Sequence, residues 1–324
     1  PFGPEYWRAR LRHAIDARAR LALDPSTDAY RLVYSESDGF PGLIVDRYGD
    51  YLVVQITTRA MAERKDLLVS LLAEELKPVG IWHRGDPDME EKEGFVLEDG
   101  LLHGEAPPLE TIVRERGFEY LVDLRAGHKT GFYLDQRENR ARVAPFVGAG
   151  EVLDGFAHSG GFSVHAMAAG AERVVLVDSS APSLALARRN LDRAGFPIPE
   201  EDLIAANCFQ MFRRFRDEGR SFDAVIIDPP KLAPTRSRVK SAIRAYKDIN
   251  LLGVKLVRPG GYLATFSCSG AVDAAAFQEM IFHAALDSGR DLKIVERLAQ
   301  PLDHPVSVTF PESQYLNGLV CRVE

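Results

Sequence analysis

The sequence predicts an α/β protein whose main domain is a mostly parallel sheet with helices on both faces, preceded by a smaller α+β domain. From about residue 119 onward, apolar runs of four to six residues alternate with helical stretches, which is typical of βαβ units around a buried parallel sheet. Before that point, β-rich runs lie between two helical stretches, and a Pro107-Pro108 pair marks the change. We therefore expect domains at 1–110 and 111–324.

In the first domain, arginines interleave with apolar residues over 5–23 and predict an amphipathic helix that Asp24-Pro25 stops. RLVYSE and YLVVQITT predict strands on either side of a turn-forming FPGLIVDRYGD. A helix is expected over 61–77, and short strands with charged turns over 81–104. Positioning RNA is the task we expect of this domain.

In the second domain, each expected strand is followed by its helix. The strand-and-helix pairs are EVLDGF with 162–169, RVVLVD with 181–194, DAVIIDPP with 239–257 and GYLATFSCSG with 272–288. LKIVERLA and NGLVCRVE predict one or two further strands at the end of the chain.

The bulk properties exclude several classes of protein. No apolar stretch approaches the roughly 18 to 20 residues of a membrane helix, so no membrane partner is expected. Three widely spaced cysteines show no metal-ligand spacing and suit a reducing cytoplasm. The net charge of −7 argues only mildly against nucleic acid, since phosphate binding needs a local basic surface. A homodimer is an open alternative.

Two aspartates follow the first two expected strands of the second domain. Asp154 leads into the glycine-rich segment GFAHSGGFS (155–163), and Asp178 ends the next strand. An acid at the second place suits the hydroxyls of a ribose. The glycine pattern is not that of a nicotinamide site, and Asp154 would repel a pyrophosphate. It would suit a charged amino group, such as that of S-adenosylmethionine. Helix N-capping by both aspartates is the plain structural alternative.

The expected strands DAVIIDPP and GYLATFSCSG end on further reactive groups. Asp228-Pro229-Pro230-Lys231 gives a rigid strand exit that could hold a planar base. Its alternative is an ordinary proline-rich turn. Cys268 lies in a polar Ser-Cys-Ser-Gly turn, where a thiolate is a credible nucleophile. A buried core cysteine is the alternative, and that is how we interpret Cys321.

Seven segments, in order, resemble the bacterial large-subunit (23S) ribosomal RNA cytosine-C5 methyltransferase family, whose members have the class I, Rossmann-like methyltransferase fold. The resemblance runs from about residue 28 to the C-terminus. The segments are SDGFPGLIVDRYG (37–49), GHKTGFYLDQRENR (127–140), VLDGFAHSGGFS (152–163), DPPK (228–231), YKDIN (246–250), TFSCSG (265–270) and DHPV (303–306). Family members commonly begin with an RNA-binding PUA domain, which is not present before Pro1. Either the chain is trimmed or RNA is recognised by other means.

The resemblance implies S-adenosylmethionine as cofactor and assigns residues to it. Its methionine part would lie at Asp154, Phe156 and Gly160, its ribose at Asp178, and its adenine at Asn207, where Asp is common. Ser159 and Ser179 are further expected cofactor contacts. We expect Cys208 near the cofactor as well, with Asp228 at the edge of the site. Tyr133, Gln136 and Arg137 match the segment that closes over the cofactor.

The resemblance also implies a reaction. The thiolate of Cys268 would add to carbon 6 of an RNA cytosine so that carbon 5 can take the methyl group, and Asp228 would bind the N3/N4 edge. No residue is assigned to the removal of the carbon 5 proton. His128, Lys129, Lys231 and Lys247 are the RNA-contacting residues expected, with Arg236, Arg238 and Lys240 on the same basic rim; a solvated surface charge is the alternative for each.

Four rival functions remain open at this point. Methylation of an exocyclic amine needs no cysteine and usually places an aromatic residue where Lys231 lies. Uracil-C5 methylation uses the same kind of residues, and only the resemblance favours cytosine. A catalytically silent RNA-binding factor and a nicotinamide oxidoreductase share the fold.

Overall fold

The computed structural model describes residues 2–21, 23–125, 132–148, 150–232 and 239–324. These residues form two compact units, Pro1–Asp135 with Pro301–Ser313, and Gln136–Gln300 with Gln314–Glu324. This division differs from the boundary expected near residue 110, because the 111–135 stretch belongs to the first unit.

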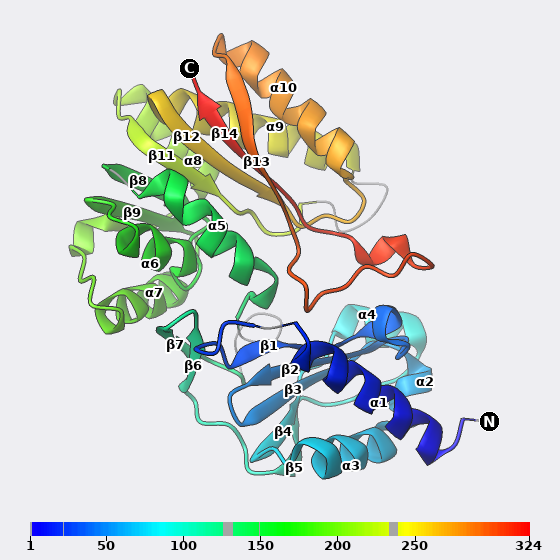
Figure 1. The fold of residues 1–324 in the computed structure, drawn as a ribbon. Helices are drawn as coiled ribbons and strands as arrows, with labels where there is room; N and C mark the ends of the chain where they lie inside the picture. Colours follow the sequence, from blue (N-terminus) through cyan, green and yellow to red (C-terminus); the bar gives the residue numbers. More distant parts are fainter. Residues whose placement is uncertain (1, 22, 126–131, 149, 233–238) are drawn as a thin grey trace. The chain divides into compact units, whose positions relative to one another are not determined.

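The first unit contains a five-stranded sheet in the order β1-β2-β3-β4-β5 and a separate hairpin, β6–β7. Only the β3–β4 pair is parallel. The strands are β1 (Ala29–Tyr34), β2 (Leu43–Tyr48), β3 (Tyr51–Ile56), β4 (Gly80–His83), β5 (Gly100–Gly104), β6 (Thr111–Glu115) and β7 (Phe118–Val122). The helices are α1 (Pro4–Ala19), α2 (Arg59–Ala62), α3 (Lys65–Leu76) and α4 (Pro87–Glu93). Figure 1 shows α1 and α3 packed beside this sheet.

Strand β2 occupies a stretch that the sequence led us to expect as a turn. Its burial alternates little, and Val45 and Tyr48 are completely buried. The turn-forming residues Phe40-Pro41-Gly42 and Gly49-Asp50 lie at its two ends, so the turns exist but enclose a strand. The helix expected over 61–77 is divided into α2 and α3, and the first helix ends at Ala19 rather than at residue 23.

The segment Pro301–Ser313 joins the first unit although it follows a strand of the second. The Asp303 carboxylate accepts a hydrogen bond from the Arg31 backbone amide at 2.8 Å, and the Tyr34 hydroxyl donates to the Ser313 carbonyl at 2.7 Å. The guanidinium of Arg18 donates to the Asp303 carbonyl at 3.2 Å. These contacts anchor the DHPV segment.

The second unit contains a seven-stranded sheet in the order β10-β9-β8-β11-β12-β14-β13. Its strands are β8 (Glu151–Gly155), β9 (Arg173–Asp178), β10 (Leu203–Ala205), β11 (Phe222–Ile227), β12 (Val257–Ser267), β13 (Leu292–Ala299) and β14 (Asn317–Val323). All neighbours from β10 to β12 are parallel, and β14 runs antiparallel to both β12 and β13. The expected α/β class is confirmed, with both C-terminal strands present.

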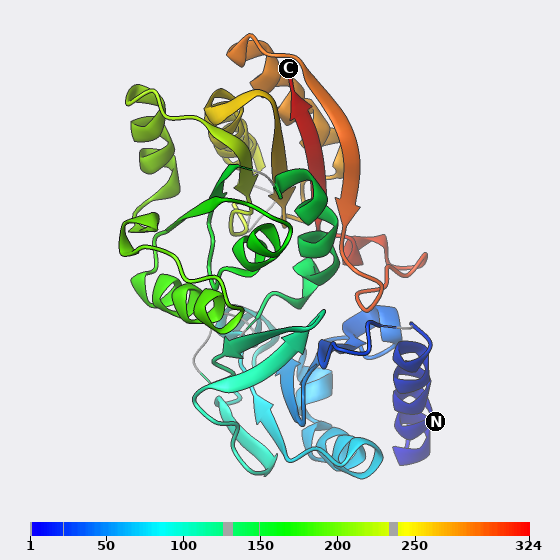
Figure 2. The same ribbon diagram turned by 60° about the vertical axis from the view of Figure 1, so that its left-hand side comes forward.

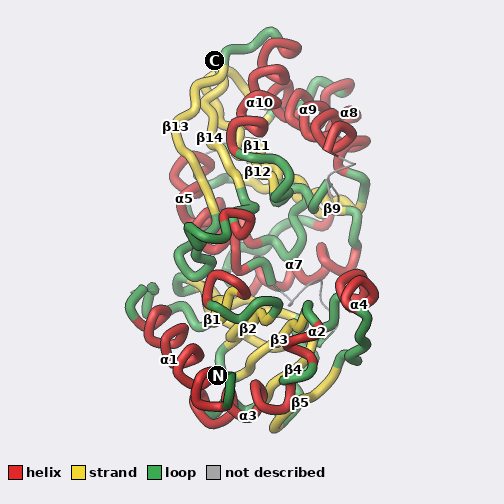
Figure 3. The backbone as a smooth tube through the Cα atoms, turned by 90° about the vertical axis from the view of Figure 1, so that its right-hand side faces the viewer, coloured by secondary structure: helices red, strands yellow, loops and turns green. Residues whose placement is uncertain are grey.

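Helices cover both faces of this sheet (Figures 1 and 2). One layer contains α5 (Arg137–Val147), α6 (Gly161–Ala168) and α7 (Ala181–Arg193). The other contains α8 (Cys208–Asp217), α9 (Val239–Leu256) and α10 (Ala274–Ser288), which lie side by side in Figure 3. The sequence did not lead us to expect α5, α8, the short strand β10 or the β6–β7 hairpin.

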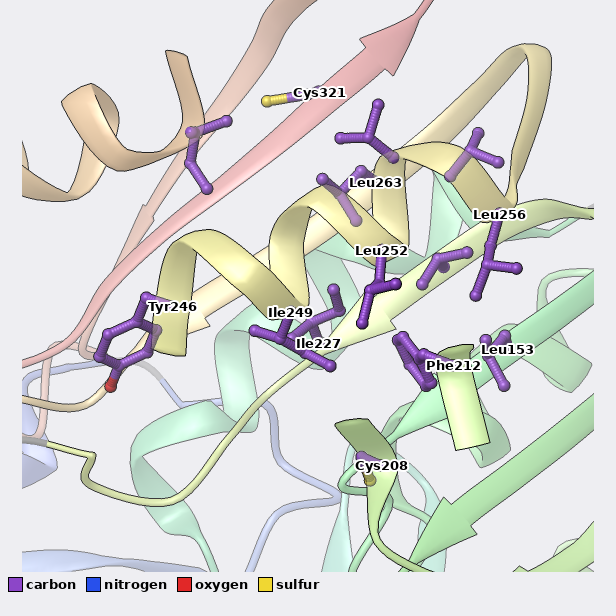
Figure 4. Close-up of a cluster of buried hydrophobic side chains, with 14 of the residues drawn as sticks. Leu153, Cys208, Phe212, Ile227, Tyr246, Ile249, Leu252, Leu256, Leu263 and Cys321 are labelled. Atoms are coloured by element: carbon purple, nitrogen blue, oxygen red, sulfur yellow. The ribbon is translucent and has the colours of Figure 1, made fainter. Parts of the chain in front are cut away.

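Between the α8–α10 layer and the sheet lies a cluster of fully buried apolar side chains. Phe212, Ile227, Ile249 and Leu263 point toward one another in this cluster (Figure 4). It continues to Cys321 on β14, which confirms the expected core position of that cysteine. Burial of this face fixes the strands whose ends carry the site. Among the described residues, no helix is long and apolar enough to cross a membrane.

Candidate functional site

The carboxyl ends of four parallel strands meet at one edge of the second sheet. The register pairs Gly155 with Val177 and with Ile227, and Ile227 with Thr265. Asp178, Asp228 and Cys268 follow these positions by one to three residues. The strand order therefore brings together the residues that the sequence placed at separate strand ends.

The segment after β8 has a constrained backbone. Phe156 and His158 have φ of 63° and 47°, in the left-handed region that is unfavourable for residues with a Cβ, and Gly160 has 77°. The amide of Phe156 donates to the Val177 carbonyl at 2.8 Å, which ties the loop to β9. Gly160 is also the N-cap of α6. The chain thus maintains a tight loop directly above two strand ends.

Asp178 is held by the backbone. One carboxylate oxygen accepts from the His158 amide at 2.9 Å, and the other from the Ser180 amide at 2.8 Å. The N-cap of α7 is Ser180 and that of α6 is Gly160, so neither Asp178 nor Asp154 caps these helices. The carboxylate is half-buried and has a fixed orientation.

Asp154 is almost completely buried at the end of β8. Desolvation by burial raises its pKa to about 7, and the neighbouring Asp178 raises it further, while the hydrogen bond from the Ser163 hydroxyl opposes the shift. That bond is 2.7 Å long. A buried acid beside a second acid is a site where a cationic group would be stabilised.

Asn207 and Cys208 form the start of α8. Asn207 is exposed and caps the helix, its side-chain oxygen accepting from the Gln210 amide at 3.2 Å. The Cys208 sulfur accepts from the Phe156 amide at 3.3 Å and contacts the Val177 carbonyl at 3.4 Å. Burial raises the pKa of this thiol to about 12, so Cys208 supports the loop as a neutral thiol (Figure 4).

Gln136 lies directly before α5 and is buried. Its amide nitrogen donates to Asp228 Oδ1 at 3.0 Å, and its oxygen accepts from the Asn139 side-chain amide at 2.6 Å. The sequence predicted a cofactor contact for Gln136, and the structure shows that its polar atoms are bonded to Asp228 and Asn139. Asn139 was not among the expected site residues.

Cys268 is half-buried, unlike the other two cysteines. Its Sγ lies 3.6 Å from the Pro229 carbonyl oxygen. The two prolines after β11 thus direct a backbone acceptor at the turn after β12. A core location, the alternative for this cysteine, does not fit its partial exposure.

Tyr246 on α9 contacts the turn that contains Cys268. The phenol is completely buried and lies 3.1 Å from the Ser269 hydroxyl. Burial raises the pKa of the phenol, and nearby Cys268 raises it further, so it stays protonated. The motif YKDIN was noted in the sequence, but this contact depends on packing between α9 and β12 and was not expected.

The remaining predicted residues are spread more widely. Ser159 is buried and Ser179 is exposed, while Arg137 is buried beside Glu138. The half-buried Tyr133 belongs to the first unit. Lys231 is exposed, and the Lys247 ammonium lies 2.6 Å from Asp287 on α10. His128, Lys129, Arg236, Arg238 and the side chain of Lys240 lie outside the described residues. No metal-binding cluster occurs among the residues described.

Solved structures share this architecture. A candidate S-adenosylmethionine-dependent methyltransferase from Streptococcus mutans superposes with a TM-score of 0.87 at 23% identity, covering 99% of this chain and 82% of its own. An S-adenosylmethionine-dependent methyltransferase from Agrobacterium tumefaciens gives 0.60 at 17% identity, covering 93% and 91%. These likenesses show the class I methyltransferase fold.

Sequence comparisons show the family. Residues 98–316 match the model of the S-adenosylmethionine-dependent methyltransferases. A protein of Shewanella amazonensis named ribosomal RNA large subunit methyltransferase I is 43% identical over 98% of this chain and 81% of its own length. One of the same name from Aeromonas salmonicida is 41% identical over 98% and 80%. With the strand-end aspartates in place and relatives this similar over almost its whole length, this chain belongs to the S-adenosylmethionine-dependent methyltransferases, in the family of these two proteins.

Proposed function

We propose that this enzyme methylates carbon 5 of a cytosine in large-subunit ribosomal RNA, with Cys268 as the nucleophile. The observation that carries the proposal is the convergence of a half-buried thiol and the Asp-Pro-Pro exit on one strand edge. The names of the relatives support the RNA substrate, and the resemblance of the seven sequence segments supports cytosine.

The residues at the strand ends fit the cofactor. S-adenosylmethionine has a cationic amino group, two ribose hydroxyls and an adenine. Asp154 would receive the amino group, since burial next to Asp178 makes a cation favourable there. Asp178 would accept from the ribose hydroxyls, because its backbone hydrogen bonds fix both oxygens. Asn207 would lie at the adenine, and Phe156, Ser159, Gly160, Ser179 and Cys208 would line the remainder. Arg137 and Tyr133 stay predicted cofactor contacts.

Cytosine carbon 5 is a weak nucleophile, so the base must be activated. The Cys268 thiolate would add to carbon 6, forming a C–S bond and placing the electron pair of the C5=C6 bond on carbon 5. As a carboxylate, Asp228 would bind the N3/N4 edge and stabilise the intermediate, in which N3 has taken a proton from solvent. When bound, S-adenosylmethionine supplies an electrophilic methyl group for carbon 5. The carbon 5 proton then leaves to a base, the C–S bond breaks, and the thiolate of Cys268 is restored.

The target base must leave its stack to reach this edge, at a cost of a few kcal/mol unless it is already in a loop. Lys231 and Lys247 are proposed RNA contacts, with His128 and Lys129. For the first unit we propose a role in positioning RNA. A homodimer and a cytoplasmic location stay predictions from the sequence.

The test is to incubate the protein with methyl-labelled S-adenosylmethionine and ribosomal RNA from a strain that lacks this enzyme. Labelled nucleosides are then identified by mass spectrometry, with Cys268→Ala alongside. Label in 5-methylcytidine that is lost in the variant supports both the reaction and the nucleophile. Label in 5-methyluridine or in a methylated exocyclic amine, or full activity of Cys268→Ala, contradicts the proposal.

A further inference from the structure

A short chain of hydrogen bonds connects the interior of α5 to the Asp-Pro-Pro exit. Asn139 is fully buried, and its Nδ2 donates to Gln136 Oε1 at 2.6 Å. Gln136 Nε2 then donates to Asp228 Oδ1 at 3.0 Å. Each donor in the chain faces an acceptor, so the three side chains form one directed relay.

Both neighbours of Gln136 require the same orientation of its amide. An ionised Asp228 has only acceptors, so it needs the amide nitrogen. The Asn139 Nδ2 is a donor, so it needs the amide oxygen. If the Gln136 amide were rotated by 180°, its oxygen would face the Asp228 carboxylate and its NH2 would face the Asn139 NH2. Each of these mismatches would cost about 1–3 kcal/mol. Asn139 and Asp228 together therefore hold Gln136 with its amide nitrogen toward Asp228.

Asn139 is not explained by stability alone. Its Oδ1 is buried and has no hydrogen-bond partner among the described residues. A buried acceptor without a partner is unfavourable and needs an explanation of its own. Donation from Nδ2 to Gln136 is a role that would explain why an asparagine lies at this position.

We propose that Asn139 is a positioning residue that acts through Gln136 to fix the Asp228 carboxylate as the acceptor for the target base. This inference rests on the proposed function, in which Asp228 binds the N3/N4 edge of cytosine. The hydrogen bond that Gln136 donates to Oδ1 favours the ionised carboxylate, which offers acceptors and no donor. The amino group of cytosine then meets an acceptor, as its recognition requires.

Reversing the polarity of the relay tests it. In Asp228→Asn, the new amide must turn its oxygen to Gln136 and its NH2 to the base, so we expect kcat/KM on cytosine RNA to fall at least about tenfold. In Asn139→Asp, the new carboxylate attracts the Gln136 NH2 and turns the amide oxygen toward Asp228. We expect kcat to fall by about tenfold or more, with an unchanged Kd for S-adenosylmethionine.

The double variant Asn139→Asp/Asp228→Asn reverses every bond of the relay. The position-228 NH2 now donates to Gln136, and its oxygen is again turned to the base. We expect the double variant to be about tenfold more active than Asp228→Asn alone. Asn139→Asp would then be harmful in the native chain and beneficial in the Asp228→Asn background. Gln136→Glu/Asp228→Asn should rescue in the same way without altering Asn139, which keeps the test valid if Asn139→Asp fails to fold.

Asp202→Asn serves as the matched control. Asp202 is buried directly before β10, and its carboxylate accepts from Arg173 at the start of β9, at the opposite end of the strands from Asp228. This exchange of one oxygen for NH2 should lower the melting temperature without changing kcat. Failure of both double variants to exceed Asp228→Asn, or full activity of Asn139→Asp, would overturn the relay. Full activity of Asp228→Asn would instead contradict the proposed contact between Asp228 and the base, and the relay with it.

Discussion

The Sγ atom of Cys268 lies 3.6 Å from the carbonyl oxygen of Pro229, which joins the exits of β12 and β11. The thiol is thereby oriented toward the edge that also carries Asp228. This geometry would place the proposed nucleophile next to the carboxylate that we propose binds the target base.

RNA in which the target cytosine carries fluorine at carbon 5 should trap Cys268. Fluorine cannot leave as a proton does, so the adduct persists after methyl transfer, and the protein–RNA complex should survive denaturing electrophoresis in the presence of S-adenosylmethionine. Cys268→Ala should form no such complex. Cys321→Ala is the control, because burial raises the pKa of that thiol to about 12 and it lies in the core. A stable adduct with Cys268→Ala would refute the assignment.

Tyr246→Phe should slow catalysis without weakening cofactor binding. The variant keeps the ring that packs against Phe277 but loses the hydroxyl at Ser269. One hydrogen bond of about 1 kcal/mol corresponds to a fall in kcat of about fivefold to tenfold if the cysteine turn loses its position. Single-turnover kinetics would measure the change, with the Kd for S-adenosylmethionine as control. An unchanged kcat would restrict Tyr246 to packing.

The strand-end residues could be predicted because ligands bind beyond the carboxyl ends of parallel strands, and those ends can be found from the apolar runs in the sequence. Asp154, Asp178, Asp228 and Cys268 each follow an apolar run, and such runs end at the same edge. Partners that lie far apart in sequence could not be predicted. The bond between Gln136 and Asp228 and that between Tyr246 and Ser269 depend on helix packing, which no local pattern encodes.

The same reason explains the errors in the first unit. Glycine and proline around 40–50 suggested one long turn, because the run of three consecutive apolar residues between them is too short to show a period. Arg18 looked like the polar face of an amphipathic helix. In the structure it is buried, with its partner Asp38 twenty residues away in sequence. Residue type alone does not show that an arginine is internal.

Arg18→Met should strongly destabilise the first unit. The guanidinium makes two hydrogen bonds to Asp38, at 2.9 and 2.6 Å, and both side chains are buried. Removing one partner leaves an unpaired buried carboxylate, at a cost of about 3–5 kcal/mol. Chemical denaturation followed by circular dichroism would measure the loss. Arg12→Met is the control, since Arg12 also pairs with a carboxylate but its side chain is 61% exposed, and it should leave the midpoint almost unchanged.

Asp178→Ala should weaken binding of S-adenosylmethionine and loosen the loop that carries Phe156. The carboxylate is the proposed acceptor for the ribose hydroxyls, and it accepts from the amides of His158 and Ser180. Loss of charge-assisted hydrogen bonds of about 1.5–3 kcal/mol corresponds to at least about a tenfold rise in Kd, measured by calorimetry. Glu172→Ala is the control, because Glu172 is an exposed acid at the opposite end of β9, outside the proposed cofactor site. Equal affinities in the two variants would contradict a ribose contact by Asp178.

Asp154→Asn should stabilise the protein but weaken its binding of S-adenosylmethionine. Because the two effects are opposite, a loss of affinity cannot be attributed to misfolding. Burial raises the Asp154 pKa from 3.8 to about 7, so the folded state keeps a proton that the unfolded chain releases. The free energy of unfolding therefore falls as pH rises from about 4 to 7. Above pH 7 the loss is complete and amounts to about 4 kcal/mol. The neutral amide avoids this loss.

We expect the melting temperatures of the variant and the native protein to be similar at pH 4 and to differ most at pH 8, where the variant melts higher. At pH 8 its Kd for S-adenosylmethionine should be higher as well, because the acid that would receive the amino group is absent. A constant difference in melting temperature across this range would show that Asp154 does not titrate there.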